Sequence, residues 1–278
     1  MPLNSASAAG LSAGADGRAL IAALAVGYEI YCGCCNAFDL NSAGWDQPIY
    51  GVVAATLACG KLMGLSPDEL GHAVALGLVP HLATYATRHG ELSSWKGCAA
   101  ANASRHAVFA TMLAGAGITG PAAPFDGKAG LYEMVGRFDW AGSLNRPPHL
   151  LVETHLKAFP LCYHGQSAVE AAFELRTKAP LGQIEEIRIE TYAIARSIMA
   201  DHPSRWAPDT RESADHSLPY VVAVALADGA VDQSSFAERR HADPVLERLM
   251  SRTSVHETDE MNALHPQASP CRILARLA

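Results

Sequence analysis

Alanine and glycine dominate the first two-fifths of the chain, and apolar residues recur there at helical spacing. Residues 18–31 and 49–63 each place Ala, Leu, Val and Ile three and four positions apart, which is the pattern of a helix with a buried face. Small side chains allow helix axes to approach one another closely. We therefore expect this part of the chain to fold as a compact bundle of helices.

One helix start is marked by several signals at once. Ser66 is an N-cap residue, Pro67 occupies the first helical position, and Glu69 stands where a capping box requires an acidic side chain. This helix is expected to end before Pro80. A further helix is predicted over residues 96–115, and a short one over 132–135 after a loop rich in Gly and Pro.

The character of the sequence changes near residue 150. Residues 184–192 alternate and carry β-branched side chains, as strands do, and two shorter strands are predicted over 253–256 and 271–274. Helices are expected over 166–176, 218–226 and 244–250. The predicted fold is mainly α, with an all-helical domain over residues 1–148 followed by a smaller α+β lid domain over residues 149–278.

Composition narrows the class of protein. The 278 residues are 49% hydrophobic and 18% charged, which is enough to bury a core, and the formal net charge is −7. A net negative charge argues against nucleic acid or an anionic membrane surface as the main partner. Polar residues, Gly or Pro interrupt every apolar run that approaches membrane-spanning length, and the N-terminus lacks the pattern of a secretory signal. We expect a soluble, cytoplasmic protein.

The seven cysteines do not suggest a disulfide framework, since their number is odd and no signal precedes them. Cys32, Cys34 and Cys35 allow a metal site to be considered. A zinc site would need a second pair of ligands downstream, whereas Cys59 and Cys98 stand alone. We expect these thiols to be core residues and predict no metal and no cofactor.

Two segments carry basic side chains close to a predicted helix start. Lys96 follows Trp95 at the start of the helix over 96–115, where unpaired backbone N–H groups attract anions; the alternative is a solvated lysine beside a core tryptophan. Lys157 and His164 flank a proline turn before the helix over 166–176 and could converge on an anion. The alternative for His164 is a capping or surface residue.

A third segment leads from a polar loop into a very apolar helix. It contains Arg211, His216 and Tyr220 within ten residues. An N-cap at Asp215 or Ser217 would explain the helix start but not why these three side chains occur together. Neither a Gly-rich phosphate loop nor a nucleophile elbow is present in the sequence.

Taken together, these segments resemble the MmgE/PrpD, or 2-methylcitrate dehydratase, family. The resemblance extends over nearly the whole chain, and its motifs occur in the family's order. It is carried by Gly27-Tyr28-Glu29, Trp95-Lys96-Gly97, Thr119-Gly120-Pro121 with Pro124-Phe125-Asp126-Gly127, Phe159-Pro160 with His164 and Gln166, and Asp215-His216-Ser217-Leu218-Pro219-Tyr220.

The resemblance implies a homodimeric lyase that uses neither a metal nor a cofactor. It implies removal of water from a hydroxylated tricarboxylate in propionate metabolism, by acid–base chemistry in a cationic pocket. By position, Lys157 and His216 would be catalytic, and substrate binding would fall to Arg211, Lys96, His164 and Tyr220.

Three alternatives remain open at this level. The same scaffold supports decarboxylation of cis-aconitate and epimerisation of iminodisuccinate. Compared with the family, the chain is expected to be short at both ends, lacking an Asp-containing stretch and a His-Pro segment before Met1. A non-catalytic protein that binds carboxylates is therefore the third alternative.

Overall fold

The structure is a computed structural model that describes residues 6–7, 9–10, 13–81, 83–140 and 146–278. The chain divides into two compact units. Unit 1 comprises residues 1–89 and 95–155, and unit 2 comprises residues 90–94 and 156–278. The division lies close to the predicted boundary at residue 148, but the short segment Gly90–Ser94 joins unit 2, which the sequence did not indicate.

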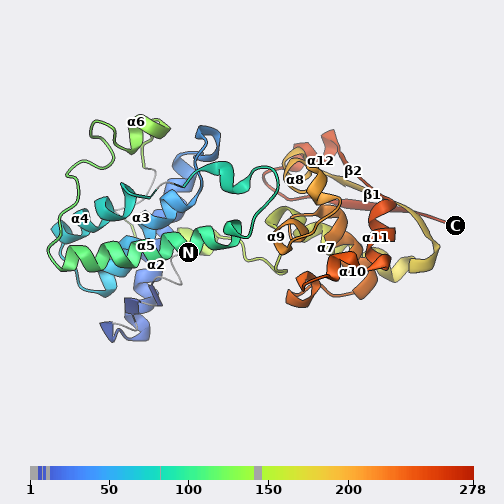
Figure 1. Cartoon of the computed structure of the whole chain (residues 1–278), viewed down its shortest axis with the longest axis horizontal. Coiled ribbons are helices and arrows are strands. Elements are labelled where there is room, and N and C mark those ends of the chain that lie inside the picture. Colours follow the sequence, from blue (N-terminus) through green and yellow to red (C-terminus); the bar gives the residue numbers. More distant parts are fainter. Residues whose placement is uncertain (1–5, 8, 11–12, 82, 141–145) are drawn as a thin grey trace. The chain divides into compact units, whose positions relative to one another are not determined.

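Unit 1 is built from helices (Figure 1). Its α-helices are α2 (Gly17–Ala37), α3 (Pro48–Leu62), α4 (Pro67–Leu78), α5 (Trp95–Gly115) and α6 (Leu131–Val135), with 3-10 turns at Asn41–Ala43, Tyr85–Arg88 and Leu150–Glu153.

Helix α3 lies at the centre of unit 1 and packs against α2, α4 and α5. It is apolar around its whole circumference, as a helix with neighbours on several sides must be. A Cβ added at Gly77 of α4 would lie 3.0 Å from Oγ1 of Thr56 on α3. This close approach is the reason that small residues are needed here.

Most predicted helix starts and ends of unit 1 are confirmed to within one residue, but α2 continues to Ala37, six residues past its predicted end at Tyr31. The Ser66 side chain accepts a hydrogen bond from the Glu69 backbone, and the Glu69 carboxylate accepts one from Ser66 N at 2.7 Å. Helix α3 stops one residue before Met63, and Gly64 follows with φ +71°, a conformation that favours glycine.

One sequence expectation about unit 1 was wrong. Helix α2 has 21 residues and a mean hydropathy of 1.4 in its most apolar window, so by length and composition it is able to cross a membrane. Gly27 and Gly33 lie inside this continuous helix, where both are buried, so neither glycine ends it. Glu29 is buried too and accepts hydrogen bonds from the backbone N–H groups of His149 and Leu150, at 2.8 and 3.0 Å. Packing inside unit 1 buries about a third of this apolar window, and Ile21 of the same helix is exposed.

Unit 2 is an α+β unit with a three-stranded sheet. Its strands are β1 (Ile184–Thr191), β2 (Thr253–Glu257) and β3 (Arg272–Leu277), in the order β2-β1-β3, with β1 parallel to β2 and antiparallel to β3. Its helices are α7 (Gln166–Lys178), α8 (Ala193–Met199), α9 (Arg211–Ala214), α10 (Leu218–Asp228), α11 (Pro244–Ser251) and α12 (Asp259–Leu264), with 3-10 turns at Tyr163–Gly165, Leu181–Gln183, Pro203–Arg205, Gln233–Phe236 and Arg240–Ala242.

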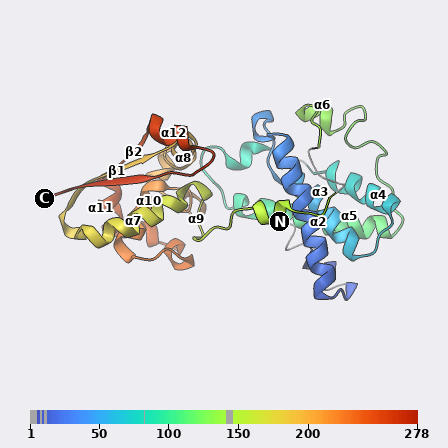
Figure 2. The ribbon, with the colours of Figure 1, turned by 180° about the vertical axis from the view of Figure 1, so that it is seen from behind.

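The core of unit 2 lies between the sheet and the helices α7, α10 and α11, which cover one side of it in both views (Figures 1 and 2). Ile184, Ile187 and Ile189 of β1 are fully buried there against the valines of α10. The mainly α fold with a smaller α+β part is confirmed.

Candidate functional site

The candidate site lies in unit 2, where two segments far apart in the sequence meet. The backbone N–H of Cys162 donates to the carbonyl of Asp215 at 2.9 Å. This bond holds the residues just before α7 against those just before α10. It thereby places Cys162 and His164 in the neighbourhood of Asp215 and His216.

His216 is held between an acid and a thiol. Its Nδ1 contacts a carboxylate oxygen of Asp215, and its ring is also hydrogen-bonded to Cys162. Burial lowers the pKa of His216, but the bonds to Asp215 and Cys162 outweigh it, so the pKa is raised above 6.5. His216 is therefore charged at pH 6.

His164 has the opposite protonation state. Its Nδ1 lies 2.6 Å from the hydroxyl of Tyr192, which is fully buried at the end of β1. Burial, aided by the positive charges of His265, His216 and Lys157, lowers the pKa of His164 to about 4. His164 is consequently neutral at pH 7, and His216 lies close enough to influence its pKa.

Lys157 is exposed, and its charge acts on the same cluster. It lowers the pKa of both His164 and Cys162. The structure thus brings together three of the residues predicted from the sequence, namely Lys157, His164 and His216. We call these three residues, together with Cys162, Asp215 and Tyr192, the His164–His216 cluster.

Two other predicted site residues of unit 2, Arg211 and Tyr220, have hydrogen-bond partners outside the cluster. Arg211 is exposed and donates to Oε1 of Gln233 at 2.6 Å, and it lines a cavity of about 300 Å³ together with Tyr220. Tyr220 is fully buried, and its hydroxyl donates to the carbonyl of Ser235 at 2.7 Å. Lys96 is the second residue of α5 in unit 1. Roles in substrate binding for Arg211, Tyr220 and Lys96 stay predictions.

Sequence reasoning missed the partners of these histidines. Asp215 was considered as an N-cap, but Ser217 caps α10 by accepting from Tyr220 N at 3.1 Å, which leaves Asp215 to hold His216. Cys162 stands between Lys157 and His164, so its position gave a signal that was not used. Tyr192 gave none, because only the packing of the strand end brings it to His164.

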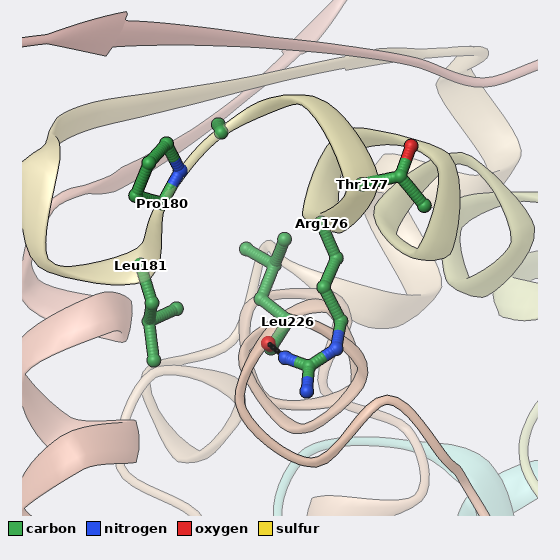
Figure 3. Close-up of a pocket in the computed structure, with 6 residues that line it drawn as sticks. Arg176, Thr177, Pro180, Leu181 and Leu226 are labelled. Atoms are coloured by element: carbon green, nitrogen blue, oxygen red, sulfur yellow. Dashed lines mark hydrogen bonds between the residues drawn. The ribbon is translucent and has the colours of Figure 1, made fainter.

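A larger cavity of about 440 Å³ lies at the end of α7 and carries little chemistry (Figure 3). Arg176 points toward α10 there and donates to the carbonyl of Leu226 at 2.8 Å. The last carbonyls of a helix attract cations, and α10 ends here at Gly229, whose φ is +70°. Arg176 therefore stabilises a helix end.

In the described residues, no three His, Cys, Asp or Glu side chains converge to hold a metal ion.

Comparison with known proteins places the chain in a family. The family model of the MmgE/PrpD N-terminal domain matches residues 3–140, and that of the MmgE/PrpD C-terminal domain matches residues 159–277. The chain belongs to the MmgE/PrpD family. All residues of the His164–His216 cluster except Lys157 lie within the match to the C-terminal domain of MmgE/PrpD proteins.

Several curated MmgE/PrpD proteins are similar to this chain. A 2-methylcitrate dehydratase of Cupriavidus necator is 29% identical over 86% of the chain and 51% of its own length. One of Salmonella typhimurium is 27% identical over 82% and 48%. A cis-aconitate decarboxylase-like protein, oryM, of Aspergillus oryzae is 26% identical over 88% and 55%. The chain spans about half the length of the curated relatives it matches.

Proposed function

We propose that this chain is a hydro-lyase of the 2-methylcitrate dehydratase type, which removes water from a hydroxylated tricarboxylate. Membership of the MmgE/PrpD family and the names of two relatives support the reaction class. The observation that carries the proposal is a pair of histidines in one cluster whose pKa values are shifted in opposite directions. Titratable groups whose pKa values are driven apart are the mark of an acid–base pair.

In this proposal, neutral His164 is the base. Its Nδ1–H donates to the Tyr192 hydroxyl oxygen, which leaves the lone pair of Nε2 to take a proton from the carbon next to a substrate carboxylate. A buried partner that fixes one tautomer is how a histidine base is oriented. Tyr192 stays protonated at neutral pH, since burial raises its pKa.

Charged His216 is the acid in this proposal. It donates a proton to the departing hydroxyl, which leaves as water, and Asp215 stabilises the charged form beforehand. Removing a proton next to a carboxylate builds up negative charge on the substrate, and Lys157 supplies a nearby positive charge to offset it. Lys157 is thus proposed to bind a substrate carboxylate.

The test is turnover of 2-methylcitrate by the purified chain, followed by the ultraviolet absorbance of the conjugated alkene product. The variants Lys157→Ala, His164→Ala and His216→Ala are expected to lose turnover while retaining the circular dichroism spectrum of the folded chain. General acid–base catalysis contributes about 10²–10⁴-fold, so the loss should be of that order for either histidine. His256→Ala, on strand β2 of the same unit, is the matched control and is expected to keep its activity. Unchanged turnover in the His164 and His216 variants would reject the assignment.

Decarboxylation is the second candidate, because the relative from Aspergillus oryzae is named cis-aconitate decarboxylase-like. A decarboxylase would release carbon dioxide from cis-aconitate, whereas the proposed hydro-lyase would release none. Measuring carbon dioxide with both substrates separates the two reactions.

We also propose that the chain forms a homodimer and serves propionate metabolism in the cytoplasm. The family resemblance supports both statements. Light scattering during size-exclusion chromatography tests the first, and growth on propionate after deletion tests the second.

A further inference from the structure

Cys162 is a nucleophilic group in the His164–His216 cluster for which the proposed dehydration has no use. Its side chain is buried, with 6% of the residue exposed. The hydrogen bond from its backbone to Asp215 fixes its position. Because Nδ1 of His216 faces Asp215, the other ring nitrogen is the one available to the thiol. Thiol, imidazole and carboxylate thus stand in a row, which is the arrangement that activates a cysteine.

The charges that face Cys162 come from several segments. His216 and Lys157 are the positive groups that favour the thiolate, together with a hydrogen bond from the backbone of His164. Arg205 and Tyr192 also interact with the thiol electrostatically. Burial raises the pKa of Cys162, but these groups outweigh it and lower the pKa below 9. Burial alone has the opposite result at Cys271 in the same unit, where it raises the pKa to about 12.

We propose that Cys162 is a reactive thiolate and a covalent modification site for small electrophiles that carry a carboxylate, in particular α,β-unsaturated carboxylates. The row of Cys162, His216 and Asp215 supplies the nucleophile. Exposed Lys157 supplies the attraction for an anion. The cluster reaches solvent at Asp215 and His216, whose side chains are 22% and 13% exposed.

The addition step uses groups that are already present. The Cys162 sulfur forms a bond to the β-carbon of the alkene, and the π electrons move to the α-carbon, next to the carboxylate. The His216 imidazolium then gives its proton to the α-carbon and becomes neutral. The product is a thioether, and nothing is oxidised or reduced. The product of the proposed dehydration belongs to this class of electrophile, and that link alone rests on the proposed function.

Alkylation of the native chain tests the thiolate without any substrate. Iodoacetamide is applied between about pH 6 and pH 9, on both sides of the ordinary thiol pKa, and each cysteine peptide is quantified by mass spectrometry. Cys162 is expected to react faster at pH 6 than in the unfolded chain, with a rate that rises less steeply toward pH 9. In the urea-unfolded chain, its rate should rise about tenfold per pH unit below the thiol pKa, as for an ordinary cysteine.

Two variants and one comparison sharpen the test. His216→Gln is expected to restore the steep pH dependence in the folded chain. Lys157→Met is expected to lower the ratio of iodoacetate to iodoacetamide labelling at Cys162 several-fold, while the ratio at exposed Cys98 serves as the control. If His216→Gln fails to fold, the comparison of native and unfolded wild-type chain still decides the question.

Maleate tests the preferred electrophile class. A thioether adduct on the Cys162 peptide, absent from Cys162→Ser, is expected after incubation of the native chain. The proposal is overturned if Cys162 is labelled only after unfolding, if its native rate rises as steeply as in urea, or if maleate gives no adduct. Because these assays measure mass and not turnover, they can succeed where the proposed dehydration fails, and the reverse.

Discussion

Replacing Asp215 by Asn removes the negative charge that keeps His216 protonated. The two side chains are in contact through Nδ1 of His216, and their exposed fractions of 13% and 22% leave little screening by solvent. Hydrogen bonds to charged groups contribute about 1.5–3 kcal/mol. Loss of this bond should therefore lower the pKa of His216.

The same substitution has a stability signature. The pKa of His216 is raised in the folded chain, so its ion pair stabilises the fold below the unfolded pKa and ceases to do so as the pH rises through the folded pKa. Wild type should therefore exceed Asp215→Asn in stability by about 1.5–3 kcal/mol near pH 6. This difference should shrink toward pH 9.

Nuclear magnetic resonance of the histidine ring protons measures this pKa, with the His216 signal assigned by its loss in His216→Gln. Urea unfolding at several pH values measures the stability difference. An unchanged His216 pKa in Asp215→Asn would refute the reasoning. A stability difference that is the same at pH 6 and pH 9 would refute it as well.

Three further predictions concern other residues. The pKa values of His81 and His164 are lowered to about 4, so as the pH falls these histidines take up protons in the unfolded chain before they do so in the folded chain. The free energy of unfolding should therefore fall by about 1–2 kcal/mol per histidine between pH 6.5 and pH 4, after discounting for partial exposure. Urea unfolding should show a flatter pH dependence in His81→Gln and in His164→Gln. Ser66→Ala removes the capping box of α4 and should cost about 1 kcal/mol in urea unfolding, whereas an unchanged midpoint would show that the cap contributes nothing. Tyr192→Phe leaves the tautomer of His164 unfixed and should lower turnover about 2–10-fold, the value of one hydrogen bond, with a full rate counting against His164 as the base.

Helices with strong local signals were predictable from the sequence. Helix α4 begins at the predicted Pro67 and ends before Pro80, because capping and proline chemistry act over a few residues. The strand β1 was predicted to within one residue of its observed end, since its β-branched residues and turn signals are local as well.

Short helices without strong local signals were not predictable, although the short helix α6 was. Helices α8, α9 and α12 have 7, 4 and 6 residues. They are too short to be stable alone, because the free-energy cost of nucleating a helix exceeds the stabilisation that one or two turns provide. Tertiary contacts hold them. The segment Gly90–Ser94 joins unit 2 for a similar reason, since buried Arg205 donates to the Gly90 carbonyl at 3.3 Å.

The charged residues of the candidate site were predictable from the sequence, but the hydrogen bonds that connect them were not. Lys157, His164 and His216 stood out because basic side chains near helix starts suit anions. The roles of Cys162 and Asp215 depend on one backbone hydrogen bond between distant segments. Sequence periodicity carries no information about such a bond.

The central claim is that neutral His164 and protonated His216 together remove water from a tricarboxylate. The most direct measurement is nuclear magnetic resonance of 2-methylcitrate incubated with the chain in deuterated water. The alkene signals of a dehydrated product should appear with wild type and be absent with His164→Ala. Substrate that stays unchanged with wild type, or that gains deuterium without losing its hydroxyl, would contradict the claim.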